Sequence, residues 1–385
     1  MISGINSAHE ALEKAKRIVV KIGSALLVED NGAIRSKWLD ALADDIAALR
    51  DQGKEILIVS SGAIAVGRTH LGLGLKSLKL EEKQAAAATG QIKLAHAYQS
   101  TLARHDITVS QILLTLEDTE GRRRHLNARN TIETLLKLGA IPIINENDTI
   151  ATSEIRFGDN DRLGARVATM IGADLLVLLS DIDGLYSDDP RKDPDATYFS
   201  VINAITPEIE DMAGEPPVGY SSGGMITKIT AGKIATDSGC HMLIANGKEL
   251  NPLMAVANGQ KRASLFLANT APQAARKSWI AGSLKSDGVV VVDDGAVKAL
   301  SKGRSLLPAG AVRVAGSFRR GDAILIENQS GEELARGLVG YNVEEVALIC
   351  GKRSSEIEKT LGYEGREELI HRDDLVLTGL KRKKG

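Results

Sequence analysis

Residues 141–149 of the chain read IPIINENDT, and FGDND follows at residues 157–161. The apolar, β-branched run at 141–144 is typical of a buried strand. Carboxylates and amides follow it directly, at a density that a loop does not need for folding. In open parallel sheets, ligands bind just beyond the carboxyl ends of the strands. The stretch therefore predicts a ligand site at a strand end. A solvated turn is the alternative, because Asn, Asp and Gly are common turn residues.

Short apolar strands alternate with longer amphipathic segments over residues 17–267. We expect strands at 18–21, 55–59, 107–114, 141–144, 174–179 and 241–245. We expect helices at about 127–138, 162–171 and 225–237, and one between the first two strands, with Ser36 as its N-cap and Gly53 just past its end. This alternation implies right-handed βαβ units and a mostly parallel sheet covered on both faces. The predicted fold is a three-layer αβα sandwich.

The pattern changes after residue 267. Short strand-like runs with glycine-containing turns are expected at 288–292, 311–314, 322–327 and 333–339, and brief helices at 296–300 and 343–349. We therefore divide the chain into a first domain at 14–268, a linker at 269–284 and a small β-rich domain at 285–378.

Composition limits the classes of function. The 48 Lys and Arg residues nearly balance the 50 Asp and Glu residues, so no strongly basic field is expected for a polyanion. Aromatic residues make up 3% of the chain, which leaves few rings for stacking on bases. RNA binding is therefore disfavoured as the main function, although it stays open as an alternative. The basic residues that keep it open are Arg313, Arg319, Arg320 and Arg336.

Cysteines and hydropathy point to the cytoplasm. Cys240 and Cys350 form no metal or redox motif, and we expect small core residues of a reducing compartment. We expect no signal peptide and no membrane span, since no apolar run approaches the ~20 residues that a bilayer needs. None of the seven histidines falls in the motifs below, so His125 and His241 are interpreted as structural or solvated.

Glycine-containing loops follow the first two predicted strands. Lys21 and Gly23 end the first strand, so the lysine would lie at the carboxyl edge of the sheet, where its charge can meet phosphate. Ser60, Ser61 and Gly62 lead from the second strand into a helix rich in small residues. Backbone N–H groups at such a helix start bind anions, and ordinary serine N-capping is an equal alternative.

Two further regions carry groups suited to ligands. Asp148 and Asn160 could receive an ammonium group, because carboxylate and amide oxygens accept hydrogen bonds, and Asp161 could orient cationic groups. Residues 221–228 read SSGGMITK and open another helix, with Lys228 one turn inside it. Neither the P-loop spacing GxxxxGK[ST] nor the dinucleotide fingerprint GxGxxG is present.

Ser180 and Asp181 follow another buried strand and lead into an acidic turn. This loop could hold the adenosine end of a nucleotide or merely cap the strand. Each of these loops is a weak signal alone. Polar and glycine-rich loops after successive strands are together what an ATP-dependent phosphotransfer site requires, because there the protein mainly positions reactants and neutralises phosphate charge.

The motifs, taken in order, resemble the glutamate 5-kinase family, which has the amino acid kinase fold. They are Lys21-Ile22-Gly23-Ser24, Ser61-Gly62-Ala63-Ile64, Asn145-Glu146-Asn147-Asp148, Gly158-Asp159-Asn160-Asp161, Ser180-Asp181 with Gly184-Leu185-Tyr186, and Gly223-Gly224-Met225 with Lys228. Residues 316–322 (GSFRRGD) and 335–337 (ARG) resemble a PUA domain, a small module also found in RNA-modifying enzymes.

The resemblance implies a reaction and its partners. The reaction is ATP-dependent phosphorylation of the γ-carboxylate of L-glutamate to L-glutamyl 5-phosphate, the first step of proline biosynthesis. It also implies Mg²⁺ with few protein ligands, inhibition by proline, a dimer or tetramer, and a functional link to glutamyl phosphate reductase. A sibling amino acid kinase with another acceptor is the alternative, although the Lys-Phe-Gly-Gly-Thr-Ser start of aspartokinases is missing.

The resemblance also assigns roles to residues. Lys21 and Lys228 would neutralise the transferred phosphoryl group, and Asp161 would hold both lysines. The glutamate-binding residues would be Ser61, Gly62, Asp148 and Asn160. The ATP-binding residues would be Lys21, Gly23, Ser180, Asp181, Ser222, Gly223, Gly224, Met225, Ile226, Thr227 and Lys228. Two departures from the family, Ala25 after Ser24 and Ser221-Ser222 in place of Gly-Thr, leave fine ATP contacts open.

The sequence alone assigns no role to two segments. The small-residue helix at 85–91 could serve packing, subunit contact or loop closure, and so could the arginine-rich turn at 122–124.

Overall fold

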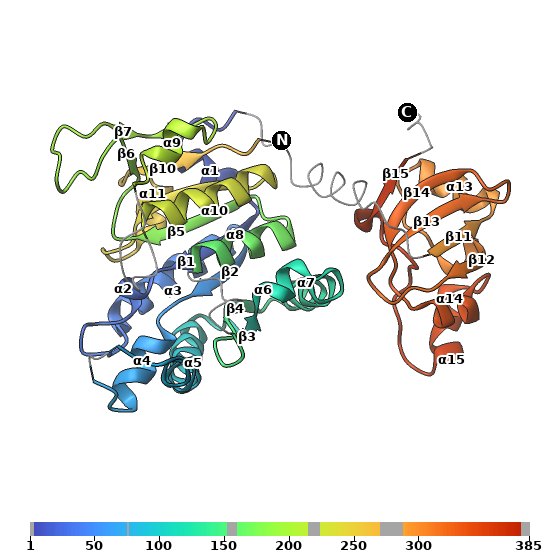
Figure 1. The fold of residues 1–385 in the computed structure, drawn as a ribbon, viewed down its shortest axis with the longest axis horizontal. Helices are drawn as coiled ribbons and strands as arrows, with labels where there is room; N and C mark the ends of the chain where they lie inside the picture. Colours follow the sequence, from blue (N-terminus) through green and yellow to red (C-terminus); the bar gives the residue numbers. More distant parts are fainter. Residues whose placement is uncertain (1–3, 75–76, 152–159, 215–223, 270–287, 379–385) are drawn as a thin grey trace. The chain divides into compact units, whose positions relative to one another are not determined.

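The protein is described by a computed structural model that covers residues 4–74, 77–151, 160–214, 224–269 and 288–378. The chain divides into two compact units, Met1–Pro272 and Gln273–Gly385 (Figure 1). The predicted linker at 269–284 lies outside the described residues except for its first residue. Within the described residues, no helix has both the length and the apolar character needed to cross a bilayer.

The first unit contains an eight-stranded sheet with the order β3-β4-β2-β1-β5-β9-β10-β8. Six strands run parallel: β1 (Arg17–Ile22), β2 (Glu55–Ser60), β3 (Val109–Leu114), β4 (Ile141–Glu146), β5 (Leu175–Ser180) and β9 (His241–Asn246). The bounds of each lie within two residues of the prediction. β10 (Ala263–Phe266) is antiparallel to β9 and pairs in parallel with β8 (Val201–Ile202). The predicted mostly parallel sheet is confirmed, and β6 (Leu185–Tyr186) and β7 (Tyr198–Phe199) form a separate hairpin.

Helices cover both faces of this sheet. One face carries α1 (Ala8–Lys14), α2 (Ser24–Leu27), α3 (Ser36–Asp51), α4 (Ala63–His70), α5 (Leu80–Leu102) and α11 (Pro252–Ala257). The other carries α6 (Leu116–Glu120), α7 (Arg122–Lys137), α8 (Asn160–Ile171), α9 (Pro207–Asp211) and α10 (Met225–Asp237). The three-layer αβα arrangement is therefore confirmed.

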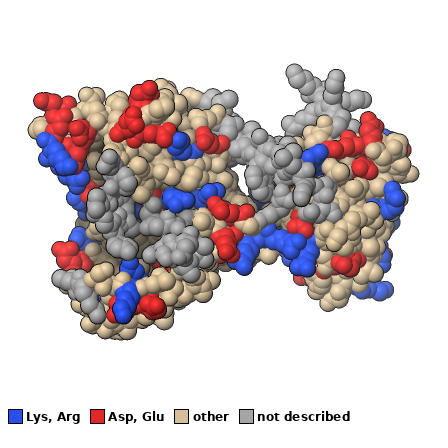
Figure 2. All heavy atoms as spheres, viewed as in Figure 1, with Lys and Arg blue, Asp and Glu red and all other residues tan. Residues whose placement is uncertain are grey.

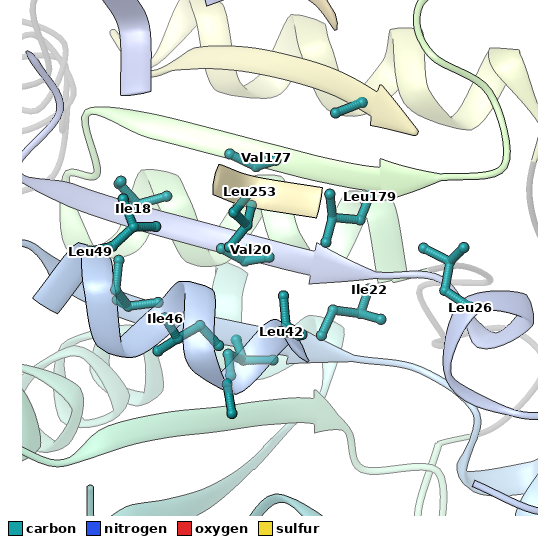
Figure 3. Packing of buried hydrophobic residues seen from close by; sticks show 14 of the residues in the cluster. Ile18, Val20, Ile22, Leu26, Leu42, Ile46, Leu49, Val177, Leu179 and Leu253 are labelled. Atoms are coloured by element: carbon teal, nitrogen blue, oxygen red, sulfur yellow. The ribbon is translucent and has the colours of Figure 1, made fainter. Parts of the chain in front are cut away.

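The alternation of side chains along β1 decides which face the site occupies. Ile18, Val20 and Ile22 are fully buried against α3, as Figure 3 shows. Because successive strand residues point to opposite faces, Val19 and Lys21 are directed towards the other helical layer. The lysine is thereby placed under α8 and α10.

Two local expectations are wrong. Arg35 takes the N-cap position of α3, and Ser36 is the first helical residue, with its hydroxyl donating to the Ile34 carbonyl. The triplet at 122–124 is not a turn but the first turn of α7, which begins directly after Gly121 and five residues before the predicted start. Gly53 does lie just past the end of α3, with a positive φ of 78°.

The helices α4 and α5 contact each other through their backbones. A Cβ atom added at Gly67 would lie 1.8 Å from the carbonyl oxygen of Ala86, and one added at Gly90 would lie 1.8 Å from that of Ala63. Only glycine fits at such a distance. The small residues at 85–91 therefore serve packing, and α5 is a much longer helix than this segment alone.

The second unit is a five-stranded sheet with the order β12-β11-β13-β14-β15. Its elements are β11 (Gly288–Val292), α13 (Asp294–Ser301), β12 (Ala311–Gly316), β13 (Ala323–Asn328), β14 (Glu333–Leu338), α14 (Val343–Ile349), α15 (Ile357–Leu361) and β15 (Leu375–Leu377). The expected β-rich character is confirmed. The strand β15 and the helix α15 were not predicted, because each is too short to show a hydrophobic period.

Candidate active site

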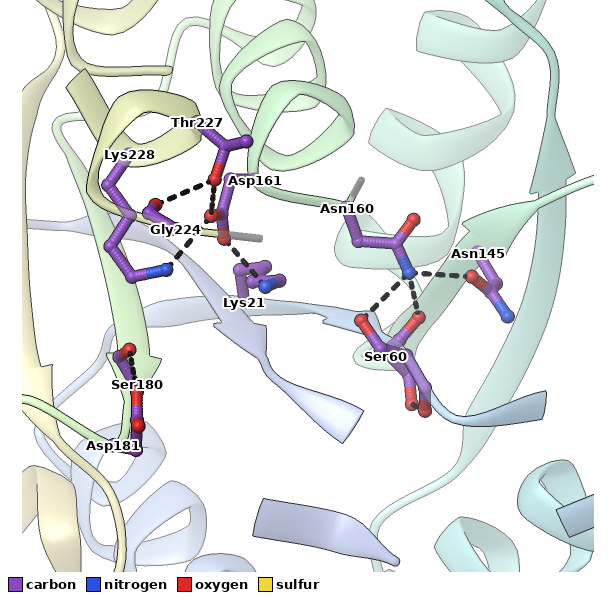
Figure 4. A network of polar contacts seen from close by, with 11 residues as sticks. Lys21, Ser60, Asn145, Asn160, Asp161, Ser180, Asp181, Gly224, Thr227 and Lys228 are labelled. Carbon is purple, nitrogen blue, oxygen red and sulfur yellow. Dashed lines mark hydrogen bonds and ion pairs between the residues drawn. The ribbon is translucent and has the colours of Figure 1, made fainter. Parts of the chain in front are cut away.

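Three charged side chains from three elements meet in the interior of the first unit (Figure 4). Lys21 comes from β1, Asp161 from the start of α8 and Lys228 from the first turn of α10. One carboxylate oxygen of Asp161 lies 2.6 Å from Lys21 Nζ, and the other lies 3.1 Å from Lys228 Nζ. The carboxylate is 1% exposed and the two lysine side chains about a tenth. The resemblance to the family assigned all three to one site, and the structure brings them together.

The cluster carries a formal excess of one positive charge. Burial alone would raise the pKa of Asp161, but the ammonium groups of Lys21 and Lys228 outweigh it and lower the pKa to about 2. Asp161 is therefore a carboxylate at neutral pH. Among the described residues, the two lysines share this one carboxylate, so an anionic ligand would offset the remaining positive charge.

Backbone geometry explains why these side chains reach one another. Gly164 on α8 faces β1, where a Cβ atom added to it would lie 3.4 Å from Lys21 Cβ. This close approach brings Asp161, nearly one turn earlier, over the strand. The hydroxyl of Thr227 lies 2.9 Å from both an Asp161 oxygen and the Gly224 carbonyl, and so ties the start of α10 to the same carboxylate.

Within the part of the chain that the structure describes, the start of α10 has no side-chain cap. Gly224 occupies the N-cap position of this helix. Its first-turn N–H groups, which include those of Met225 and Ile226, are therefore open to an anion.

A second polar network lies at the ends of β2 and β4. The amide nitrogen of Asn160 donates to the Ser60 carbonyl at 2.7 Å, to Asn145 Oδ1 at 2.9 Å and to Ser61 Oγ at 3.0 Å (Figure 4). Asn160 directly precedes Asp161 on α8, so this network and the charged cluster are neighbours. The predicted residues Ser61 and Asn160 are thus in contact.

The loop between β2 and α4 is shaped by Gly62, which adopts a positive φ of 98°. Gly62 takes the N-cap position of α4, and within the described residues no side chain caps this helix. The interpretation of the serines as N-caps is therefore wrong, because Ser61 Oγ accepts from Asn160 instead. Asp148 lies in the turn just after β4.

The end of β5 lies beside β1 in register, with Lys21 opposite Leu178. Ser180, the last residue of β5, is buried and donates to Asp181 Oδ1 at 3.2 Å. Gly23 lies against the same strand, since a Cβ atom added to it would be 3.6 Å from the Leu179 carbonyl. The two loops predicted to bind nucleotide are therefore neighbours at the carboxyl edge of the sheet.

The model of the amino acid kinase family matches residues 16–246, and that of the PUA domain matches residues 288–361. The chain is 59% identical to glutamate 5-kinase from Paramagnetospirillum magneticum, over 96% of this chain and 99% of that protein. It is 62% identical to glutamate 5-kinase from Agrobacterium fabrum, over 96% of this chain and 95% of that protein.

The chain belongs to the glutamate 5-kinase group of the amino acid kinase family. The resemblance seen in the motifs is confirmed, and so is the PUA domain.

Ser222 and Gly223 lie outside the described residues. His125 Nδ1 lies 2.9 Å from the Thr119 carbonyl, and His241 Nδ1 accepts from the backbone of Ala268, so both histidines have local structural partners.

Both cysteines are free: Cys240 is buried, Cys350 is partly buried, and both pack in hydrophobic cores, as expected.

The structure adds two residues that the sequence analysis did not assign to the site. Asn145 accepts from Asn160, and Gln91 of α5 accepts from Asn145 Nδ2 at 2.8 Å. Asn145 lies inside the opening motif, so its position was a usable signal. Gln91 is 54 positions away and carries no local signal. Among the described residues, no group of three or more His, Cys, Asp or Glu side chains could hold a metal ion.

Proposed function

We propose that the protein transfers the γ-phosphoryl group of ATP to the γ-carboxylate of L-glutamate and so forms L-glutamyl 5-phosphate. The observation that carries this proposal is the buried cluster of Lys21, Asp161 and Lys228 at the carboxyl edge of the sheet. The shared name of the relatives, glutamate 5-kinase, gives the acceptor.

The cluster suits a reaction between two anions. A γ-carboxylate, with a pKa near ~4.3, is already ionised at neutral pH, so no general base is needed. The difficulty is to bring it to a triphosphate. Lys21 and Lys228 would contact the transferred phosphoryl group and offset its charge, while Asp161 holds the two ammonium groups in place before the substrate arrives. Such preorganised charge in a dry site is usually the largest contribution to catalysis.

The second network would bind glutamate. The amide nitrogen of Asn160 is held by Ser60, Ser61 and Asn145, whereas its Oδ1 accepts no hydrogen bond from the described residues. A carbonyl oxygen in this position, together with the carboxylate of Asp148 in the turn after β4, would receive the α-ammonium group. The Ser61 hydroxyl and the backbone at Gly62 would contact the rest of the substrate.

The nucleotide would bind across the loops after β1 and β5 and the start of α10. The backbone at Gly23 and Gly224 and the first turn of α10, from Met225 to Thr227, would face the phosphates, and Ser180 with Asp181 the nucleoside end. Ser222 and Gly223 keep their predicted ATP-binding role.

Mg²⁺ fits this set of residues only as an ion held mainly by phosphate oxygens and water, as is common for this metal. Asp161, which is paired with both lysines, is a poor ligand for it. The ion would offset phosphate charge.

The remaining expectations stay proposals drawn from the family. They are proline inhibition, the place in proline biosynthesis, a dimer or tetramer, a link to glutamyl phosphate reductase and a cytoplasmic location.

Proline inhibition is testable at Asp148. If proline and glutamate share a pocket, Asp148→Ala weakens both ligands together. A raised glutamate KM with unchanged proline inhibition would exclude a shared pocket.

An acyl-phosphate trapping assay tests the proposed function. The purified chain is incubated with ATP, Mg²⁺ and hydroxylamine, which converts acyl phosphates to hydroxamates, with L-glutamate, L-aspartate, acetylglutamate or no acceptor. We expect hydroxamate with L-glutamate alone. A signal with a different acceptor would keep the phosphotransfer site but refute the substrate, and no signal with any acceptor would refute the proposed function.

A further inference from the structure

The orientation of the Asn160 side chain decides what it can offer a ligand. Its Nδ2 atom has two hydrogens and three oxygen acceptors within 3.0 Å. Its Oδ1 points away from all three of them, as Figure 4 shows. If the amide were rotated by half a turn, the oxygen would meet those three acceptors and the NH₂ group would replace the carbonyl. An ammonium group would then find a donor where it needs an acceptor.

Two backbone groups identify which atom of each amide in this network is the nitrogen and which is the oxygen. The Ser60 carbonyl can only accept, so the atom of Asn160 that faces it is the nitrogen. The N–H of Glu146 can only donate and lies 2.9 Å from one amide atom of Asn145, which is therefore Oδ1. Asn145 Nδ2 must then face Gln91, and the atom of Gln91 that receives it, at 2.8 Å, is Oε1.

Gln91 thus supplies the last acceptor of a chain of amides. Gln91 and Asn145 are 8% and 3% exposed, so a lost partner would leave a buried N–H group unpaired. Gln91 is brought to this place by its neighbour Gly90, where α5 contacts the backbone of α4. α4 itself starts directly after Gly62.

We propose that Gln91 is a positioning residue for the acceptor substrate. It does not touch the substrate. By accepting from Asn145, it keeps Asn145 Oδ1 on Asn160 Nδ2, and so keeps Asn160 Oδ1 directed at the ammonium group of the acceptor. The inference rests on the proposed function and assigns Gln91 to the acceptor side of the site, with no part in ATP binding.

Two substitutions separate positioning from bulk packing. Gln91→Met keeps the length of the side chain but removes the acceptor. Gln91→Glu keeps an acceptor oxygen whether or not its carboxyl is protonated. We expect Gln91→Met to raise the KM for L-glutamate about tenfold or more, as loss of a hydrogen bond to a charged group does, and to leave the KM for ATP within about twofold. We expect Gln91→Glu to keep the glutamate KM within about threefold of the wild-type value.

A matched control lies on the same helix. Thr101 is a buried polar residue of α5, so Thr101→Val reports the effect of an apolar substitution on this helix alone. We expect it to keep the wild-type KM for glutamate. Gln91→Asn, which withdraws the amide by one bond, is a second test in case Gln91→Met does not fold, and it should raise the glutamate KM in the same way.

The possible outcomes are distinct. If the wild type is active and Gln91→Met leaves the glutamate KM unchanged, the role of Gln91 is overturned and the proposed function stands. Equal defects in Gln91→Met and Gln91→Glu, with both KM values and thermal stability affected, would show a purely structural role and also overturn it. Failure of both Gln91→Met and Gln91→Asn to fold would do the same. A wild-type chain that forms no hydroxamate would overturn the proposed function and, with it, this inference.

Discussion

The substitution Asp161→Asn removes the negative charge between Lys21 and Lys228 and keeps the size of the side chain. A carboxyl group whose pKa falls from 3.8 to about 2 on folding contributes roughly 2–3 kcal/mol to stability at neutral pH. The change also leaves two buried lysines without their shared counter-ion. We therefore expect a loss of about 3–5 kcal/mol in the free energy of unfolding. For a unit of this size, that is a fall in Tm of roughly 10 °C.

The stabilisation by Asp161 depends on pH. Because the folded-state pKa of Asp161 lies below its unfolded value, the stabilisation is present above about pH 4 and is lost as the pH falls towards 2. The difference in stability between wild type and Asp161→Asn should therefore be largest near neutral pH and shrink in acid.

Thermal unfolding at pH 7 and at several acidic pH values is the assay. Since the chain has two compact units, two transitions are possible, and the shift should be confined to the transition that ATP also moves. The control is Asp44→Asn, because Asp44 is half-exposed and pairs at the surface with Arg104 and His105, so its loss should cost less than about 1 kcal/mol. Equal stability of Asp161→Asn and wild type at pH 7 would refute the electrostatic account of the cluster.

Three further outcomes are expected. Lys228→Met should lower kcat for hydroxamate formation by about 100-fold or more while the glutamate KM changes little, and a normal kcat would contradict its role. Gly90→Ala should lower the free energy of unfolding by about 2 kcal/mol or more in denaturant titrations, because the new methyl group meets the Ala63 carbonyl, and wild-type stability would disprove that contact. Asp45→Ala should cost about 1–2 kcal/mol, since the buried carboxylate accepts from the N–H groups of Leu253 and Met254 at the start of α11, and the same titration would show it.

Much of the fold could be predicted because it depends on short-range periodicity. The alternation of apolar residues in β1 sets both the strand and the face to which Lys21 is directed. Likewise, the polar residues directly after β4 marked the site, since ligands collect at the carboxyl ends of parallel strands. Helix starts were predicted less well. Ser36 has the chemistry of an N-cap, but the backbone begins the helix one residue earlier and leaves its hydroxyl for Ile34.

The contacts inside the site could not be predicted from local pattern. Asp161 and Lys228 are 67 positions apart, and only the resemblance to a family suggested their pairing before the structure placed them 3.1 Å apart. The contact between Gln91 and Asn145 was even harder to predict from the sequence. The role of Gln91 depends on how closely α5 crosses α4 at Gly90. The small residues of both segments are visible in the sequence, but which helix each would contact is not.

The most direct test of the central claim is to follow the oxygen that attacks phosphorus. L-Glutamate labelled with ¹⁸O in its γ-carboxylate is incubated with the protein, ATP and Mg²⁺, and the product is trapped with hydroxylamine. Hydroxylamine attacks the carbonyl carbon and releases phosphate with the bridging oxygen. We predict that, for each hydroxamate formed, one phosphate carries a single ¹⁸O atom in mass spectrometry. Unlabelled phosphate alone would mean that water attacks ATP, and it would contradict carboxylate phosphorylation at this site.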